Sequence, residues 1–278
     1  MKAISVATTL FIATCVSAQD LPQPSPSGEV EQVVGLTKVE VEYSRPSVKG
    51  RVIFGELVKY DELWRTGANL NTTIEFSSEV KFGDQDLKPG KYSLFTVPGK
   101  TTWVVKLNKN TELWGEGDFK EEETVVALKV EAQPTEFTET MTFEFANVVG
   151  DNADLVLRWE KTKVVIPIKT DATAQGIANI EEAMKKGDMK SGGYNASARF
   201  ALDRKVMTKE AVEWATKSVA MDKKYYNSHT LARAQAANGM VKEARQTAEE
   251  SMKMAQEAKN EAYVKMNREL IEELSKGK

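Results

Sequence analysis

The chain contains 278 residues, of which 28% are charged, and its formal net charge is only −3. It lacks the basic stripe that nucleic-acid binding requires, so we exclude a nucleic-acid-binding protein. A single histidine and a single cysteine are too few for a typical transition-metal site, and we expect neither a metal nor a cofactor.

The first 18 residues have the pattern of a secretory signal peptide. Lys2 precedes a short apolar run, and residues 16–18 are small, which favours cleavage before Gln19. Cys15 follows a threonine, a poor residue before a lipidated cysteine, so the pattern favours signal cleavage over a lipid anchor. No later run approaches 18 apolar residues, and we expect no membrane span. The sequence therefore predicts an exported protein of a Gram-negative periplasm or cell envelope, or a secreted one.

The next segments differ in their apolar period. Residues 19–35 begin rich in proline and serine and predict a linker. From residue 36 to residue 170 the period is two, as in TKVEVEYS, and KYSLFTVPGKTTWVVKLN has the pattern of a hairpin. About eight short strands follow one another with no helical pattern between them. This order predicts an antiparallel β-sandwich domain.

Residues 171–278 are rich in alanine and have a period of 3.6. Two segments, KEAVEWATKSVAMD and KEARQTAEESMKMA, begin at Lys209 and Lys242 and coincide at several positions. A repeat of about 34 residues in helical sequence is typical of tetratricopeptide repeats. We expect two such repeats and a capping helix. The predicted fold class is therefore α+β with segregated domains, a sandwich followed by a tetratricopeptide-like helical array.

Three stretches of the sandwich region resemble a known family. They are YSRPSVKGRVIFGELVKYDELWRTGANLNTTIEFSSEV, LKPGKYSLFTVPGKTTWVVKLNK and LRWEKTKVVIP. Over about residues 36–170 the chain resembles the bacterial domain of unknown function 2911. The resemblance implies an exported β-rich domain, often fused to tetratricopeptide-like helices. It implies no catalytic residues.

A long polar and aromatic segment, residues 44–73, separates two of the predicted strands. Loops of this length are more often functional than idle. Arginines suit carboxylates or phosphates, and aromatic plates beside amide side chains suit sugars. The candidate ligand-binding residues are Arg45, Arg51, Trp64, Arg65, Asn69 and Asn71, with Trp114 from the later segment WGEGDF.

The same loop also admits a structural role. Ile53, Phe54 and Trp64 would pack it as a lid on the sandwich, and the arginines would bind carbonyls or carboxylates. A second alternative is a glycan hydrolase that uses a carboxylate pair, for example Glu42 or Glu75 with Asp61. These alternatives remain open at the level of sequence.

The helical region supports a protein partner, a bracing role or purely structural assembly. His229 has the context of an ordinary helix-face residue. The side chains that would lie on a concave face are Asn195, Arg199, Tyr226, Arg233 and Asn238. The leading hypothesis is a non-catalytic binding or scaffold protein: loop 45–71 contacts a small polar, glycan-like ligand, and the helices contact a protein.

Overall fold

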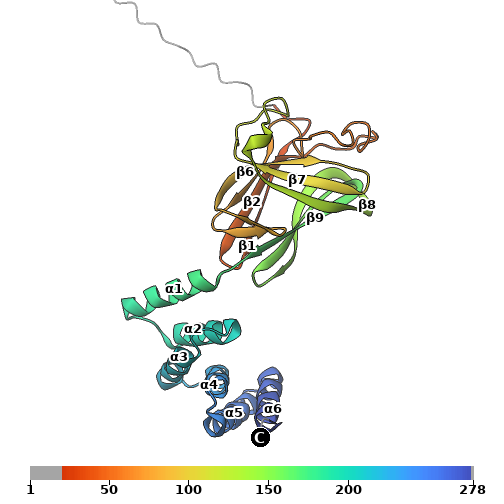
Figure 1. The fold of residues 1–278 in the computed structure, drawn as a ribbon. Coiled ribbons are helices and arrows are strands. Elements are labelled where there is room, and N and C mark those ends of the chain that lie inside the picture. The colour runs from red at the N-terminus through yellow and green to blue at the C-terminus, as the bar shows by residue number, and fades with distance from the viewer. Residues whose placement is uncertain (1–20, 277–278) are drawn as a thin grey trace, which may run out of the picture. The chain divides into compact units, whose positions relative to one another are not determined.

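The computed structural model describes residues 21–276. The predicted signal segment, with Cys15, lies outside the described residues. The chain forms two compact units that divide between Thr170 and Asp171 (Figure 1). The first unit is built from strands and the second from helices. The expected α+β arrangement in separate regions is therefore confirmed.

The β unit is one antiparallel sheet of nine strands in the order β1-β2-β3-β6-β7-β8-β9-β4-β5. The strands are β1 (Ser27–Val34), β2 (Thr37–Ser44), β3 (Thr72–Phe76), β4 (Val80–Phe82), β5 (Gln85–Leu87), β6 (Gly90–Val97), β7 (Thr102–Asn108), β8 (Thr124–Val149) and β9 (Asn152–Thr170), with a 3-10 turn at Glu121–Glu123. Alternate residues of β2 are buried, which is the burial that its period of two predicts.

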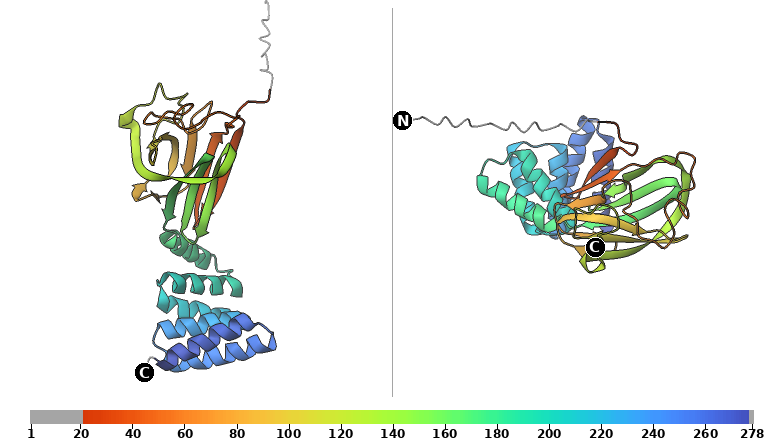
Figure 2. Two further views of the ribbon diagram at one scale, coloured as in Figure 1. Left: turned by 90° about the vertical axis from the view of Figure 1, so that its right-hand side faces the viewer. Right: turned by 90° about the horizontal axis from the view of Figure 1, so that it is seen from above.

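The sheet curls over on itself through its longest strand. The first part of β8 pairs with β7 and the second part, from Ala132 onwards, pairs with β9 (Figure 2). Across the interior, the rings of Tyr43 on β2 and Phe143 on β8 lie 5.0 Å apart, and the Phe143 amide donates a hydrogen bond of 3.0 Å to the Tyr43 hydroxyl. The two layers are thus continuous through β8 and share one core.

Strand β1 lies within the segment that was predicted to be a linker, and that prediction was wrong for residues 27–34. All eight residues of β1 pair with β2. β1 ends the strand order, so it pairs on one side only, and only Val34 is fully buried. An edge strand with so little burial leaves a weak apolar pattern in the sequence.

The α unit contains six helices. They are α1 (Thr173–Lys186), α2 (Ser191–Arg204), α3 (Thr208–Met221), α4 (Tyr225–Ala237), α5 (Val241–Glu257) and α6 (Glu261–Lys276). Its apolar core consists largely of alanines around Trp214, and small residues let helices pack closely. No helix within residues 21–276 is long and apolar enough to cross a membrane.

Candidate functional site

The loop between β2 and β3 is anchored to the sheet instead of projecting from it. Trp64 and Thr96 exchange two backbone hydrogen bonds of 2.8 and 2.9 Å. The Val48 amide donates a bond of 2.8 Å to the Glu139 carbonyl of β8. Ile53 is fully buried in the core of the sheet unit. The loop is therefore held to the sheet by backbone hydrogen bonds at Val48 and Trp64 and by the buried side chain of Ile53 between them.

Trp64 belongs to a cluster of aromatic rings in this core. Its ring stacks on that of Trp159, with 5.8 Å between centroids and 20° between planes. Phe54 and Trp103 meet Trp64 edge to face. The Trp64 indole N–H donates a hydrogen bond of 3.1 Å to the Gly67 carbonyl. Trp64 is only 7% exposed, so it packs the loop and presents little ring face to a ligand.

Arg65 joins the loop to the later segment WGEGDF. Its Nε lies 3.2 Å from Oε1 of Glu116, and the same oxygen accepts a bond of 3.0 Å from the Arg65 backbone amide. Nη1 of Arg65 donates to the Asn69 carbonyl at 2.8 Å. The Asn69 amide in turn donates to the Ser25 carbonyl at 3.0 Å. These contacts fix the turn at residues 66–69.

The other two candidate arginines also donate to nearby groups. Arg45 donates to the Met141 carbonyl at 3.1 Å and to the Thr142 hydroxyl at 2.8 Å, both on β8. Arg51 is exposed and donates to the carbonyls of Val48 and Ser47 within its own loop. Arg45 therefore ties the start of the loop after β2 to β8, whereas Arg51 stays at the surface.

A hollow of about 460 Å³ lies against the loop, and we call it the loop hollow. Its lining includes four candidate residues, Arg51, Trp64, Arg65 and Asn69, together with Glu116 and Trp159. Trp159 is 1% exposed, and its indole N–H has no hydrogen-bond partner among the described residues. An unpaired buried donor is costly, so it marks a place where an acceptor is favoured.

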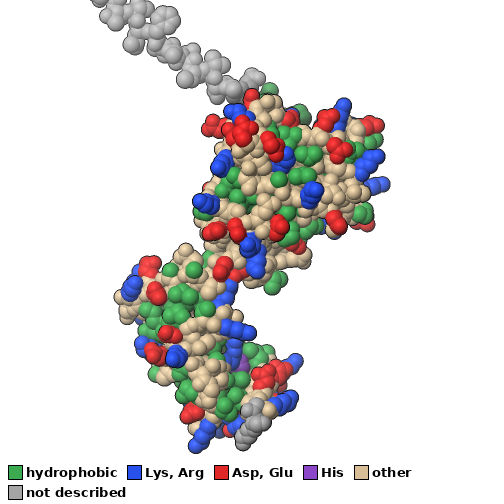
Figure 3. All heavy atoms as spheres, viewed as in Figure 1, with side chains coloured by type: hydrophobic (Ala, Val, Ile, Leu, Met, Phe, Trp, Pro, Cys, Tyr) green, Lys and Arg blue, Asp and Glu red, His purple; other side chains and the backbone are tan. Residues whose placement is uncertain are grey.

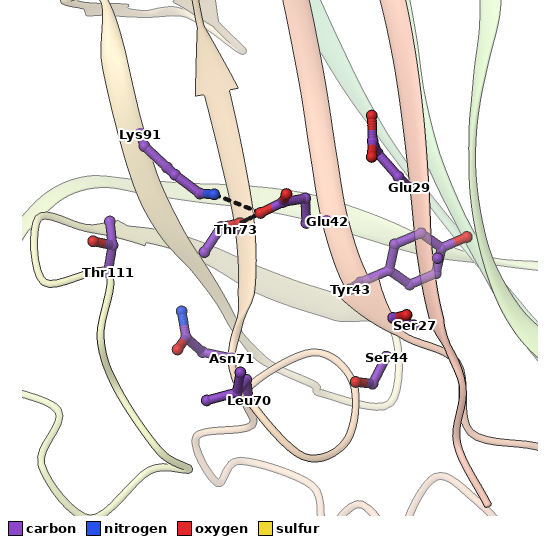
Figure 4. A pocket seen from close by; sticks show the side chains of 11 residues that line it. Ser27, Glu29, Glu42, Tyr43, Ser44, Leu70, Asn71, Thr73, Lys91 and Thr111 are labelled. Carbon is purple, nitrogen blue, oxygen red and sulfur yellow. Dashed lines mark hydrogen bonds and ion pairs between the residues drawn. The ribbon is translucent and has the colours of Figure 1, made fainter. Parts of the chain in front are cut away.

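A second hollow, of about 600 Å³, lies over strands β1, β2, β3 and β6, and we call it the strand hollow (Figure 4). Lys91 and Glu42 point toward each other there, with 2.5 Å between Nζ and Oε2. The Thr73 hydroxyl donates to the same oxygen at 3.3 Å. Asn71, a candidate residue, also lines this hollow and donates to the Ser93 hydroxyl at 2.6 Å.

The carboxylates considered for hydrolysis do not form a convergent pair in either hollow. The hydrogen bond from Lys91 lowers the pKa of Glu42, and the bond from Thr73 adds to this. Glu42 is thus held ionised, whereas a general acid needs a raised pKa. Glu75 lines a different depression, and Asp61 lines neither the loop hollow nor the strand hollow.

Two candidate residues lie outside both hollows. Arg45 is used in the contact with β8, and Trp114 is 67% exposed. Sequence reasoning missed Trp159 and Glu116 in the loop hollow and Lys91 in the strand hollow. Trp159 has the position of an ordinary core residue in an apolar strand, and the two charged residues are common surface types. All three lie in stretches quoted from the sequence, LRWEKTKVVIP, WGEGDF and LKPGKYSLFTVPGKTTWVVKLNK, but no local pattern distinguishes them from their neighbours there.

Three carboxylates on β1 and β2 lie close together, with ligand atoms of Glu29, Glu31 and Glu40 within 4.8 Å of one another. Lys38 lies 2.7 Å from both Glu31 and Glu40. The hydrogen bonds to Glu31 and Glu40 raise the pKa of Lys38, so its ammonium group balances the charge of two of the three carboxylates. The cluster is better described as an ion-pair network than as a metal site.

The α unit places charged residues around its histidine. Figure 3 shows Lys and Arg side chains beside the purple histidine. His229 is 5% exposed, and its Nδ1 lies 2.8 Å from Oδ1 of Asn267. Burial lowers the pKa of His229, and the charges of Arg233 and Arg199 lower it further. Oδ1 of Asn195 is buried and has no partner among the described residues.

Comparison with known proteins gives one match. A family model described as "Protein of unknown function (DUF2911)" matches residues 25–168, just over half of the chain. The match includes β1, which begins at Ser27. No curated protein and no solved structure matches the chain.

Proposed function

The chain belongs to the DUF2911 family of proteins of unknown function, and we propose that it is a non-catalytic binding protein whose sheet unit holds a small polar, glycan-like ligand. The loop hollow is the binding site. The observation that carries the proposal is Trp159, which lines this hollow and whose buried indole N–H has no hydrogen-bond partner among the described residues. A hydroxyl or carboxylate oxygen of a ligand would satisfy this donor.

The rest of the lining suits a ligand with many hydroxyl groups. Lys59 and Glu62 are exposed at the rim, and Arg65 and Glu116 lie deeper as a pair. A hydroxyl both donates and accepts hydrogen bonds, so it can contact cations and carboxylates alike. Leu57 is 48% exposed and adds apolar surface for C–H groups. The volume of about 460 Å³ is within the usual range for small-molecule sites.

The test is calorimetric titration of the wild type with neutral sugars and sugar acids, followed by Trp159→Phe. We expect Trp159→Phe to weaken binding about tenfold, because one hydrogen bond is lost. The matched control is Trp103→Phe, which makes the same change in the same aromatic cluster outside the loop hollow. Equal affinities of both variants and the wild type would contradict the proposal, as would the absence of any binding sugar.

A surface variant covers the case in which Trp159→Phe fails to fold. Lys59 is exposed at the rim of the loop hollow, and Lys59→Ala is expected to weaken binding several-fold. Lys100 is equally exposed and lines neither hollow, so Lys100→Ala is the control. Unchanged binding by Lys59→Ala would count against the loop hollow as the site.

We further propose that the protein is exported and that its helices are tetratricopeptide-like repeats that bind a protein partner. The signal pattern of residues 1–18 supports export. Helices α2 and α4 begin at Ser191 and Tyr225, which is the spacing of that repeat. Ser218 on α3 donates to the Ser191 carbonyl at 2.9 Å, and Ser251 on α5 donates to the Tyr225 carbonyl at 2.7 Å. In both helix pairs, α2–α3 and α4–α5, a serine of the second helix therefore donates to the carbonyl of the first residue of the first helix.

Charge indicates the kind of partner segment. Arg199 and Arg233 occupy positions on α2 and α4 that are separated by one repeat, and the positive charge of each lowers the pKa of His229. Arg233 already pairs with Asp203 at 2.7 Å, so an acidic peptide would compete with this carboxylate for the pair of cations. The probe is a fluorescent decapeptide of glutamate, measured by anisotropy. We expect Arg199→Glu and Arg233→Glu to abolish binding and Arg245→Glu on α5 to preserve it. Equal loss in all three variants would indicate general charge attraction and contradict the site.

A further inference from the structure

The loop hollow and the strand hollow adjoin each other. Three segments of the chain contribute to both of them: residues 25–27, residues 44–46 and residues 68–71. In the last segment, Ala68 and Asn69 line the loop hollow, whereas the next two residues line the strand hollow. The two hollows are therefore lined by neighbouring residues of the same three segments.

The dividing turn is held in one conformation. Asn69 has a φ of 57°, in the left-handed region that asparagine tolerates better than most residues. Its side-chain amide donates to the Ser25 carbonyl at 3.0 Å and to the Ser44 hydroxyl at 3.3 Å. Its own carbonyl accepts from Arg65. Both other shared segments are thus bonded to Asn69, which makes it a fixed ridge between the hollows.

The strand hollow has the chemistry of a second subsite for the same kind of ligand. Lys91 supplies a donor and Glu42 an ionised acceptor, and they carry opposite charges (Figure 4). Thr73 and Thr111 add hydroxyls, and Leu70 beside them is 56% exposed. Alternating donors and acceptors next to a small apolar surface match the hydroxyl edges and C–H faces of a sugar unit.

We propose that the two hollows are neighbouring subsites of one extended site, and that the preferred ligand is an oligosaccharide of two or more units that crosses the Asn69 ridge. This inference rests on the proposed function, because it assumes that the loop hollow holds one sugar unit. It adds that a single unit fills only part of the site. Affinity should therefore rise with chain length until both hollows are occupied, and then stay constant.

The experiment measures the dissociation constant of the full-length mature chain for oligomers of one to six units. Two series serve as probes, N-acetylglucosamine oligomers for neutral chains and galacturonic acid oligomers for acidic chains. For the series that binds, we expect affinity to increase at least tenfold between one unit and three, followed by a plateau. Lys91→Ala should remove this increase, so that three units bind no more tightly than one.

The control for Lys91→Ala is Lys81→Ala. Both lysines are exposed strand residues in an ion pair, Lys91 with Glu42 and Lys81 with Asp86, but Lys81 lines neither hollow. Circular dichroism of each variant is the check that the fold is retained. If Lys91→Ala binds every length as the wild type does, while Lys59→Ala weakens every length, the second subsite is overturned and the proposed function stands. If neither series binds the wild type, both are overturned.

Discussion

Trp64 illustrates how one residue can satisfy two interpretations of a sequence. It packs the loop against Trp159 and bonds to Gly67, as a structural lid requires, and it also lines the loop hollow. A substitution of Trp64 would disturb both roles at once. The loss of binding in a Trp64 variant would therefore say little about ligand contact. The test instead uses Trp159→Phe, which keeps an aromatic ring in the core, and the surface variant Lys59→Ala.

His229 is the residue whose environment predicts a pH effect. The side-chain amide of Asn267 donates to the Ser251 hydroxyl and to the Tyr263 carbonyl, so its oxygen accepts the proton of His229 Nδ1. Burial makes the charged imidazolium unfavourable in the folded state. The pKa of His229 is therefore below its ordinary value when the chain is folded.

We expect the α unit to lose stability as the pH falls from 7.5 to 5. In the unfolded chain His229 binds a proton at about pH 6.5, whereas in the folded chain it stays neutral at this pH. The contribution of neutral His229 to the free energy of unfolding is therefore fully present above this pH and decreases below it, by at most about 1.4 kcal/mol per pH unit. The measurement is urea unfolding followed by circular dichroism at 222 nm. His229→Gln should lose less over this range. The same pH dependence in both chains would contradict the assignment to His229.

At the scale of elements, one buried hydroxyl of helix α3 contacts both neighbouring helices. Ser218 donates to the Ser191 carbonyl at the start of α2 and accepts from the Asn227 amide of α4 at 3.0 Å. Ser218 is fully buried, so its removal leaves polar groups of two other helices without this partner. Ser218 thus bonds to two other helices from within an alanine-rich core.

We expect Ser218→Ala to lower the free energy of unfolding of the α unit by roughly 1–3 kcal/mol, because buried hydrogen-bonding groups lose their partner. The control is Ser197→Ala. Ser197 is also buried, but its hydroxyl donates only to the Gly193 carbonyl of its own helix, and alanine favours helix. Ser197→Ala should change stability by about 0.5 kcal/mol or less. Equal losses in urea unfolding of the two variants would refute the role of Ser218.

Elements differ in how well the sequence predicts them. β2 was predicted because its inward residues alternate strictly and are all buried. β1 was missed because it is an edge strand with one fully buried residue. The length of β8 was also missed. Its two parts pair with different neighbours, and a strand that changes partners has the local pattern of two short strands.

At the scale of the whole molecule, the two units have cores of different composition. The sheet unit buries large side chains such as Trp103, Trp159 and Phe76, whereas the α unit buries mostly alanines around Trp214. This difference agrees with the local patterns, since pleated strands favour β-branched and aromatic residues and closely packed helices favour small ones. Each proposed binding site accordingly belongs to one unit and is argued from that unit alone.

The sequence by itself determined the order of the two units, the β and α classes, the family and the unusual loop of residues 44–73, because each of these depends on local periodicity or on a contiguous motif. Only the tertiary structure decided that Trp159 meets a loop about a hundred positions earlier in the chain, that its N–H is unpaired, and that two hollows share the Asn69 turn. These features arise from contacts between segments far apart in the chain. Such contacts leave no periodic trace in either segment.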